Sequence, residues 1–431
     1  MRQIVIIGNG ISGITAARHI RKQSDDAITV ISGESAHFFS RTALMYIYMG
    51  HMRYQDTKPY EDHFWVKNRI DLVEGRVQHV DVETKRLLLE DERAVPFDVL
   101  IIATGSVTNK FGWPGQDLPG VQGLYSLQDL ELMEQNTKGI SRAVIVGGGL
   151  IGVEMAEMLL SRKIAVTFLV REEWFWSGVL PREEAEMIGR HLRTHGVDLR
   201  LGSELDSILP DANGHVRAIR TKSGEEIDCQ FVGLTAGVSP NIAWLKNSTG
   251  IATDKGVLVN EYLETEVPGI YAIGDCAQFR SHPDPERKSI EQVWYTGRMM
   301  GETVAQTVTG QRTTYDPGIW FNSAKFFDIE YQTYGWVRNT LREDEAAHYW
   351  EHPNGCMAIH FAWKRADRRF SGVNVFGIRL RHEVFDRWLR SGVTVDHVID
   401  HLHDAQFDPE FFTRYEPMIA ASFRSITKQP A

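Results

Sequence analysis

The residues best placed to do chemistry are glycines spaced for phosphate binding. Gly8, Gly10 and Gly13 follow a run of aliphatic residues and precede an alanine-rich segment. In this spacing the first glycine permits a tight turn, the second admits a diphosphate to backbone N–H groups, and the third lets a helix pack closely. The helix start adds unpaired N–H groups and the positive end of its dipole. We therefore predict a dinucleotide site that includes Ile11 and Ser12; a turn that uses glycine only for packing is the alternative.

The same pattern recurs in the middle of the chain. Gly147, Gly149 and Gly152 follow a second aliphatic run, and Leu150 and Ile151 lie where the next helix begins. Two such patterns, each with the correct strand and helix flanks, predict two separate dinucleotide sites. A chain that binds two dinucleotides is expected to combine a flavin with a nicotinamide.

The residue after the second strand of each pattern indicates which nucleotide it holds. Glu34 follows the first such strand and is a candidate acceptor for ribose hydroxyls. At the second site Val170 stands where an NADH enzyme has an acid, and Arg171 next to it can pair with a 2′-phosphate. NADPH is therefore slightly favoured over NADH, although Glu172 and Glu173 weaken that preference.

Composition limits the other classes of function. The 431 residues carry a formal net charge of −10, which argues against nucleic acid as a partner. No apolar run is long enough for a membrane span, and the chain enters a strand at once, so we expect a cytoplasmic protein. The three cysteines, Cys229, Cys276 and Cys356, are too few and dispersed for a disulfide framework or a thiolate site, and no metal is predicted.

Three further segments connect these patterns into one arrangement. Each is a strand-like run that ends in small residues, at 97–106, 231–241 and 267–277. In this order and spacing the chain resembles the FAD-dependent pyridine nucleotide-disulfide oxidoreductase superfamily over residues 1 to about 312. The resemblance implies an α/β fold with two Rossmann-like three-layer nucleotide-binding domains and a C-terminal α+β domain. The expected domains are a split FAD domain (1–110 and 236–312), an inserted NAD(P)H domain (111–235) and a C-terminal interface domain (313–431).

The resemblance also implies roles for individual residues. Asp275 is expected to accept hydrogen bonds from the flavin ribityl chain, whereas by itself the Gly274-Asp275 pair would be a turn with an N-cap. Trp294 and Trp320 are candidate flavin contacts, with ordinary core packing as the alternative. The remaining FAD-binding candidates are Val77, Ala103, Thr104, Gly105, Ala236, Gly237, Gln292 and Val293.

The N-terminal part of the chain, up to Arg41, indicates which branch of the superfamily the chain resembles. No cysteine precedes Cys229, so disulfide reduction is disfavoured. The Glu-x-x-x-x-Phe-x-Arg run that ends at Arg41 resembles instead the branch of ferredoxin and rubredoxin reductases and apoptosis-inducing-factor-like proteins. There the matching arginine contacts FAD, with the pyrophosphate as the expected partner; a surface ion pair is the alternative. Glu154 is the one catalytic candidate and is expected to hydrogen-bond the nicotinamide carboxamide. In the related branch a lysine usually pairs with the glutamate that matches Glu154, and this chain lacks that lysine.

The C-terminal third has a different character. Its patterns predict a hairpin around Asn354-Gly355, a third strand and two helices, a small α+β domain that is a possible homodimer interface. His397 and His401 lie one helical turn apart, but without a convincing third ligand they are expected to be solvent or interface histidines. The predicted segments are strands at 348–351, 356–361 and 371–376, helices at 381–391 and 394–405, and a helix start at 407–412.

Together these features predict an FAD-dependent NAD(P)H oxidoreductase. A hydride would pass from the nicotinamide to FAD, and electrons would then go to a separate acceptor. A small ferredoxin- or rubredoxin-like carrier is the preferred partner, because the chain offers no cysteine chemistry of its own. The alternatives are a quinone or other small-molecule reductase and a redox-sensing flavoprotein subunit of a larger complex.

Overall fold

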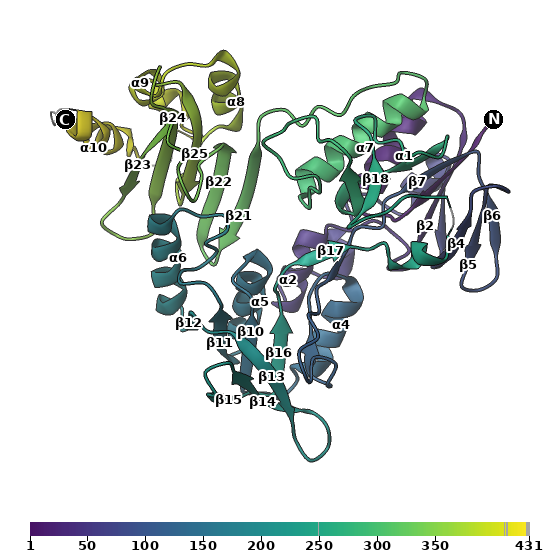
Figure 1. The fold of residues 1–431 in the computed structure, drawn as a ribbon, viewed down its shortest axis with the longest axis horizontal. Helices are drawn as coiled ribbons and strands as arrows, with labels where there is room; N and C mark the ends of the chain where they lie inside the picture. Colours follow the sequence, from purple (N-terminus) through teal and green to yellow (C-terminus); the bar gives the residue numbers. More distant parts are fainter. Residues whose placement is uncertain (249, 409, 411–412, 428–431) are drawn as a thin grey trace. The chain divides into compact units, whose positions relative to one another are not determined.

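The computed structural model describes residues 1–248, 250–408, 410 and 413–427 (Figure 1). Pro409, Phe411 and Phe412, which belong to the predicted helix start at 407–412, lie outside the described residues. The chain folds into two compact units. Unit 1 comprises Met1–Phe111, Gln122–Gly139 and Leu234–Pro317; unit 2 comprises Gly112–Val121, Ile140–Gly233 and Gly318–Ala431. The division into three domains at the predicted boundaries stays a prediction.

Unit 1 is built on a five-stranded sheet in which all neighbouring strands are parallel. Its central strands are aliphatic and buried on both faces, as expected for a parallel sheet covered on both sides. In spatial order the strands are β19 (Ile270–Ala272), β7 (Val99–Ile102), β1 (Gln3–Ile7), β2 (Ala27–Ser32) and β3 (Ile70–Glu74).

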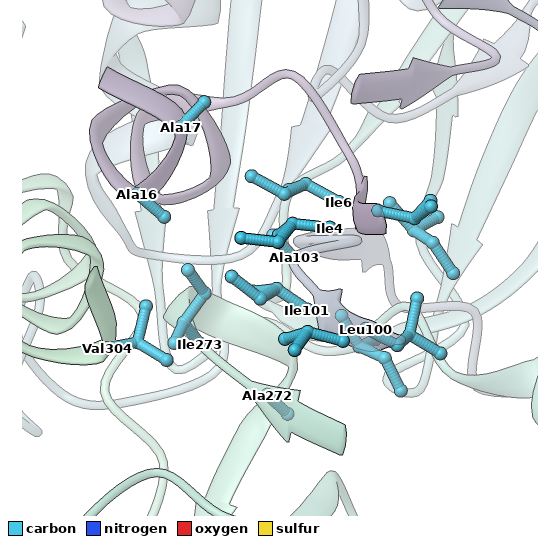
Figure 2. Packing of buried hydrophobic residues seen from close by; sticks show 14 of the residues in the cluster. Ile4, Ile6, Ala16, Ala17, Leu100, Ile101, Ala103, Ala272, Ile273 and Val304 are labelled. Atoms are coloured by element: carbon cyan, nitrogen blue, oxygen red, sulfur yellow. The ribbon is translucent and has the colours of Figure 1, made fainter. Parts of the chain in front are cut away.

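Two helices, α1 (Ile11–Gln23) and α7 (Trp294–Val308), pack against each other in unit 1. In Figure 2, Ile4, Ile6 and Ile101 extend from neighbouring strands toward Ala16 of α1 and Val304 of α7. This core holds the turn between β1 and α1 firmly in place. The other helices of unit 1 are α2 (Leu44–Tyr48), α3 (His63–Lys67) and α4 (Leu127–Asn136).

Short strands complete unit 1. β8 (Ser106–Thr108) pairs antiparallel with β17 (Val238–Pro240), which joins two segments far apart in the sequence. β18 (Val257–Val259) pairs with β20 (Ala277–Phe279). A separate antiparallel sheet contains β4 (Val77–Asp81), β5 (Arg86–Leu89) and β6 (Ala94–Pro96).

Unit 2 contains a second sheet with a parallel core, which carries the second glycine turn. Its strand order is β12 (Asp198–Leu201), β11 (Ala165–Val170), β10 (Arg142–Val146), β16 (Phe231–Leu234) and β9 (Val121–Gln122). The accompanying elements are α5 (Leu150–Ser161), α6 (Arg182–Thr194) and the small antiparallel sheet of β13 (Leu205–Pro210), β14 (Val216–Thr221) and β15 (Glu226–Asp228).

The C-terminal part of unit 2 is a five-stranded antiparallel sheet with helices. The predicted hairpin and third strand are present, and two further strands that the sequence patterns did not predict extend the sheet (Figure 1). In spatial order the strands are β21 (Phe321–Phe326), β22 (Ile329–Gly335), β25 (Phe370–Phe376), β24 (Ala358–Lys364) and β23 (Glu345–Glu351). The helices are α8 (His382–Ser391), α9 (Val395–Asp400) and α10 (Glu416–Thr427).

The structure therefore confirms the predicted fold class, an α/β chain with two Rossmann-like sheets and a C-terminal antiparallel sheet. It refines the predicted hairpin, whose second strand begins at Ala358 rather than at Cys356. In the described part of the chain, no helix is both long and apolar enough to cross a bilayer.

Candidate dinucleotide sites

The first glycine turn lies between β1 and α1. Gly8 has a φ of +109°, and a Cβ atom there would overlap the Ala103 carbonyl oxygen, so the position requires glycine. A Cβ on Gly13 would overlap the Gly8 carbonyl oxygen. A Cβ on Gly10, in contrast, would meet no atom of the described chain within 4 Å. The first and third glycines are thus packed against backbone atoms, whereas the second glycine has free space beside it.

The open position is also the N-cap of α1. Within the described residues, no side chain caps this helix, so its first N–H groups, beginning with Ile11 and Ser12, face the open side of Gly10. A helix N-terminus in this state attracts anions through its dipole and its donors. The residues present therefore fit the diphosphate of a dinucleotide.

The second glycine turn repeats this construction between β10 and α5. Gly147 has a φ of +117°. A Cβ on Gly152 would lie 2.5 Å from the Phe168 ring and 2.8 Å from the Gly147 carbonyl oxygen. A Cβ on Gly149 would meet nothing within 4 Å of it in the described residues, and this glycine is the N-cap before Leu150 and Ile151. Each unit therefore carries one turn of the same design.

Glu34 and Arg41 form a bidentate ion pair near the end of β2. The two guanidinium nitrogens donate to the two Glu34 carboxylate oxygens at 2.7 and 2.6 Å. Arg41 also donates to the Tyr125 carbonyl oxygen at 2.6 Å, and its guanidinium lies 4.6 Å from the centre of the Tyr125 ring. The Leu127 N–H donates to Glu34 at 3.0 Å. Both predicted residues are therefore fixed in position, and the carboxylate keeps acceptor capacity for ribose hydroxyls.

Asp275 lies at the centre of a buried polar network. Its Oδ2 accepts from the Ser106 hydroxyl at 3.0 Å and from the Tyr125 hydroxyl at 3.2 Å. Gln292 donates to the Ser106 hydroxyl oxygen at 2.9 Å. Burial raises the pKa of Asp275, and the hydrogen bonds from Ser106 and Tyr125 counteract part of that rise. A carboxylate has about four lone-pair sites, so Asp275 can also accept from a ligand diol.

Two small-residue turns meet beside this network. Thr104 donates to the Asn241 carbonyl oxygen at 2.8 Å, and the Asn241 N–H donates to the Gly105 carbonyl oxygen at 2.9 Å. Gly105 and Gly237 have positive φ values of +67° and +91°. The tertiary structure thus brings together within unit 1 the two segments that hold the predicted residues Ala103, Thr104, Gly105, Ala236 and Gly237.

The start of α7 lies against the first glycine turn. A Cβ on Gly297 would lie 3.6 Å from Ile11 and 3.8 Å from the Cα of Gly274. Val293 is the N-cap of α7, and Trp294, its first residue, is 37% exposed. These candidates are therefore close to the site predicted for FAD, and Trp294 is not simply a core residue.

Val77 and Trp320 have different surroundings. Val77 opens β4, where it pairs with Leu89. Trp320 belongs to unit 2 and stacks on Trp336, with ring centres 5.4 Å apart and an angle of 5° between the planes. These surroundings do not test the flavin contact expected of Trp320 or the FAD contact expected of Val77, and both stay predictions.

Glu154 lies on α5, just after the second glycine turn. Burial, reinforced by the neighbouring carboxylate of Glu157, raises the pKa of Glu154 to about 7. Lys325 of β21 pairs with Glu157 at 2.9 Å and not with Glu154. No side chain in the described part of the chain donates a hydrogen bond to Glu154. Its charge is thus reduced by protonation and not by a lysine.

Arg171 directly follows β11 and is 71% exposed, with Glu172 as an ion-pair partner at 3.0 Å. Val170 is fully buried. A Cβ on Gly148 would lie 2.7 Å from the Val170 side chain, so Val170 closes the back of the second turn. The position that often holds an acid is therefore apolar here, and a cation stands next to it.

The cysteines offer no redox-active pair. All three are free; Cys229 and Cys276 are buried, and Cys356 is half-buried. Burial raises the pKa of Cys229 to about 12, and burial also raises the pKa of Cys276. Because a thiolate is the reactive form, these raised pKa values disfavour thiol chemistry at the two buried cysteines.

Two residues of the network around Asp275 were not among the predicted site residues. Ser106 is the last residue of the small-residue turn predicted at 97–106, and this position could have identified it as a site residue. Tyr125 has no such signal, because it is a single aromatic residue before the N-cap of α4. Its role depends on contacts with residues 84 and 150 positions away.

Comparison with known proteins agrees with this geometry. Residues 2–301 match the model of the pyridine nucleotide-disulphide oxidoreductase family. The chain belongs to this family, which uses FAD and NAD(P)H.

Curated relatives include three reductases. The chain is 30% identical over 282 residues to a nitrite reductase [NAD(P)H] of Bacillus subtilis (strain 168), covering 65% of this chain and 35% of that protein. It is 29% identical over 333 residues to a rhodocoxin reductase of Rhodococcus erythropolis, covering 75% and 76%. It is 28% identical over 281 residues to a rubredoxin-NAD(+) reductase of Pseudomonas putida, covering 64% and 72%. The chain thus spans about a third of the nitrite reductase and about three quarters of the other two.

Solved structures share the fold. A ferredoxin reductase from Rhodopseudomonas palustris superposes with a TM-score of 0.80 at 22% identity, covering 95% of this chain and 96% of that one. The covalent complex of putidaredoxin reductase with putidaredoxin gives a TM-score of 0.80 at 20% identity, covering 98% and 99%.

Proposed function

We propose that the chain is an FAD-dependent NAD(P)H oxidoreductase that passes electrons to a small carrier protein of the ferredoxin or rubredoxin class. The observation that carries the proposal is the pair of glycine turns, one in each unit, each open at its second glycine before an uncapped helix. Bound FAD would supply the redox chemistry, since it accepts a hydride from a nicotinamide and can release electrons singly. Family membership supports this assignment.

The residues proposed to hold FAD act by binding and orientation. The turn at Gly10 would take the diphosphate, Glu34 would accept from ribose hydroxyls, and Asp275 would accept from the ribityl chain. Arg41 would hold Glu34 in position and offset its charge. The full proposed set is Gly8, Gly10, Ile11, Ser12, Gly13, Glu34, Arg41, Val77, Ala103, Thr104, Gly105, Ala236, Gly237, Gly274, Asp275, Gln292, Val293, Trp294 and Trp320.

The second turn would hold the nicotinamide dinucleotide through Gly147, Gly149, Leu150, Ile151 and Gly152. Glu154, one helical turn into α5, would orient the carboxamide. With a pKa of about 7, its carboxyl group is partly protonated near neutral pH and can either donate to or accept from an amide. A lysine partner for this carboxyl group is not needed for that role.

The preferred nucleotide in the proposal is NADPH. Arg171 offers an exposed guanidinium to a 2′-phosphate, and Val170 removes the acid that would repel it. An engineered water-forming NADPH oxidase with this fold carries alanine in place of an aspartate and arginine in place of the next residue. The order of residue types at Val170 and Arg171 is the same, a small or apolar residue followed by arginine.

A carrier protein as acceptor is supported by the relatives and by the cysteines. The chain covers about three quarters of the length of relatives named as rhodocoxin and rubredoxin reductases. The two buried thiols have raised pKa values, which disfavours a thiol relay within this chain.

We also infer a cytoplasmic location, which the free cysteines favour. We further infer a homodimer that forms through the C-terminal sheet and helices, and sedimentation would test this oligomeric state.

A second candidate is the electron-input module of a larger reductase. It is favoured by the match to the nitrite reductase and to an assimilatory nitrate reductase electron transfer subunit of Bacillus subtilis (strain 168), of which the chain covers 35% and 36%. In that case reduction by the nucleotide would be fast, but free ferredoxin or rubredoxin would not be reduced.

Anaerobic stopped-flow reduction of the purified yellow protein tests the proposal. We expect NADPH to bleach the flavin faster than NADH, and subsequent mixing with ferredoxin or rubredoxin plus cytochrome to restore the oxidised spectrum. Failure of both nucleotides to bleach the flavin would overturn the enzyme assignment. Bleaching without transfer to any carrier, but with transfer to a quinone, would overturn the choice of acceptor.

A further inference from the structure

Unit 2 contains a cluster of potential metal ligands that the proposed function does not use. His191 lies on α6, and His195 directly follows the last residue of that helix. The two residues are one helical turn apart on the same face, and their ring centres lie 4.3 Å apart. Asp328 lies in the turn between β21 and β22. One ligand atom from each of these three residues lies within 4.8 Å of the other two.

The distances suit a small divalent cation. Asp328 Oδ1 lies 3.5 Å from His195 Nε2 and 2.6 Å from His191 Nε2. Tetrahedral zinc with bonds of about 2.0–2.2 Å separates its ligand atoms by roughly 3.3–3.5 Å. One separation already matches this value. The 2.6 Å separation between Asp328 Oδ1 and His191 Nε2 is that of a hydrogen bond, and it would lengthen when a cation replaced the proton between the two atoms.

The surrounding residues orient the imidazole rings. His195 Nδ1 lies 3.0 Å from the His191 carbonyl oxygen, so it carries the proton there and leaves the Nε2 lone pair for a cation. The Phe327 ring stacks on His195 at 4.6 Å and is itself buried. The side chain of His191 is only 4% exposed, whereas that of Asp328 is 74% exposed. The site is therefore rigid on its inner side and accessible from solvent.

The turn that presents Asp328 is strained. Phe327 has a φ of +55°, a left-handed conformation that bulky side chains rarely adopt. Such a conformation is kept only where the surroundings require it. Here the conformation buries the Phe327 ring against His195 and directs Asp328 to the histidines.

A second histidine pair serves as an internal comparison. His397 and His401 of the α9 region have the same spacing, ring centres 4.1 Å apart, and the same bond from His401 Nδ1 to the His397 carbonyl oxygen at 2.9 Å. Within the described residues, no carboxylate joins this pair in a three-ligand cluster. The carboxylate is what distinguishes the first pair from an ordinary pair of helical histidines.

We propose that His191, His195 and Asp328 bind one divalent cation of the zinc class, with solvent at the remaining position. Two imidazoles and one carboxylate are ligands that suit zinc and its neighbours in the first transition series. The cation would link α6 to the hairpin of β21 and β22, and so would stabilise unit 2. The proposal does not depend on the redox function proposed above.

Calorimetric titration of the chelator-treated full-length protein with zinc chloride tests this site. We expect one equivalent to bind, and zinc at about 100 times its Kd to raise the melting temperature by roughly 3 °C. Asp328→Asn and His195→Gln are each expected to weaken binding at least about 10-fold. Because Asp328 is exposed, Asp328→Asn is expected to leave the circular dichroism spectrum unchanged.

His401→Gln is the matched control and is expected to bind zinc like the original protein. Cobalt should give the intense visible bands of a four-coordinate site in the original protein and in His401→Gln, and not in Asp328→Asn. The proposal is overturned by the absence of a saturable equivalent, by unchanged affinity in Asp328→Asn, or by equal loss in His401→Gln.

Discussion

The two glycine turns have the same backbone design but very different polar surroundings. Beside the first turn, Asp275 accepts from two donors and Glu34 holds Arg41 through two hydrogen bonds. Beside the second turn, Glu154 has a raised pKa and no hydrogen-bond donor in the described residues, and Arg171 is exposed. A pre-formed polar network suits a cofactor that stays bound, whereas sparse and exposed contacts suit a nucleotide that must exchange.

The backbone constrains the two turns to different degrees. The first and third glycines of the first turn face carbonyl oxygens, which cannot move without disturbing the sheet. The third glycine of the second turn faces the end of the Phe168 ring as well as a carbonyl oxygen. Substitutions of the first or third glycine of the first turn should therefore destabilise the protein more than substitution of the third glycine of the second turn.

Gly8→Ala should damage the protein most. The added Cβ would overlap the Ala103 carbonyl oxygen at a φ of +109°, so we expect a loss of more than about 3 kcal/mol in the free energy of unfolding and little bound FAD. Denaturant unfolding and the ratio of flavin to protein absorbance measure both effects. The control is Gly10→Ala, which has room for its methyl group and should fold normally while binding FAD more weakly. A yellow Gly8→Ala protein of unchanged stability would contradict the backbone argument.

Asp275→Ala should have the next largest effect. It removes the acceptor of two hydrogen bonds and the proposed contact to the ribityl chain, and hydrogen bonds to charged groups contribute about 1.5–3 kcal/mol. We expect FAD to bind roughly 10- to 100-fold more weakly in equilibrium titration of the apoprotein. Tyr125→Phe removes only one donor and should cause a smaller change. The network is not a FAD site if Asp275→Ala retains the original affinity.

Glu154→Gln should remove a pH dependence from unit 2. The folded protein holds the Glu154 proton up to a pH of about 7, whereas an unfolded glutamate loses it near its ordinary pKa of 4.5. The free energy of unfolding should therefore fall as the pH rises between these values, by roughly 1–3 kcal/mol. Urea unfolding at several pH values would measure the slope. Identical profiles for the glutamine variant and the original protein would show that Glu154 does not titrate in this range.

The smallest expected effect is that of Arg171→Ala. Loss of one charge-assisted contact should weaken NADPH binding by about 10-fold and leave NADH binding nearly unchanged. Fluorescence titration with both nucleotides measures this difference. In the opposite direction, Glu172→Gln frees Arg171 from its ion pair and should favour NADPH. Equal weakening of both nucleotides by Arg171→Ala would show that the residue does not read the 2′-phosphate.

The class of fold and the positions of both turns could be predicted from local sequence patterns. Aliphatic strands followed by spaced glycines and a helix are local patterns, and β1, α1, β10 and α5 lie where these patterns placed them. The hairpin around Gly355 was predictable for the same reason, since turn residues act within a few positions of the chain. The lack of a cysteine pair was likewise evident from the sequence alone.

Which polar groups contact each other could not be predicted from local patterns, because the partners lie far apart in the sequence. Tyr125 donates a hydrogen bond to Asp275, 150 positions away in the sequence. Lys325 pairs with Glu157, which is 168 positions away, and not with Glu154. The cluster of His191, His195 and Asp328 likewise needs β21 and β22, which the patterns did not predict. Local periodicity fixes elements, but the partners of a buried charge depend on which elements pack together, and that choice belongs to the fold as a whole.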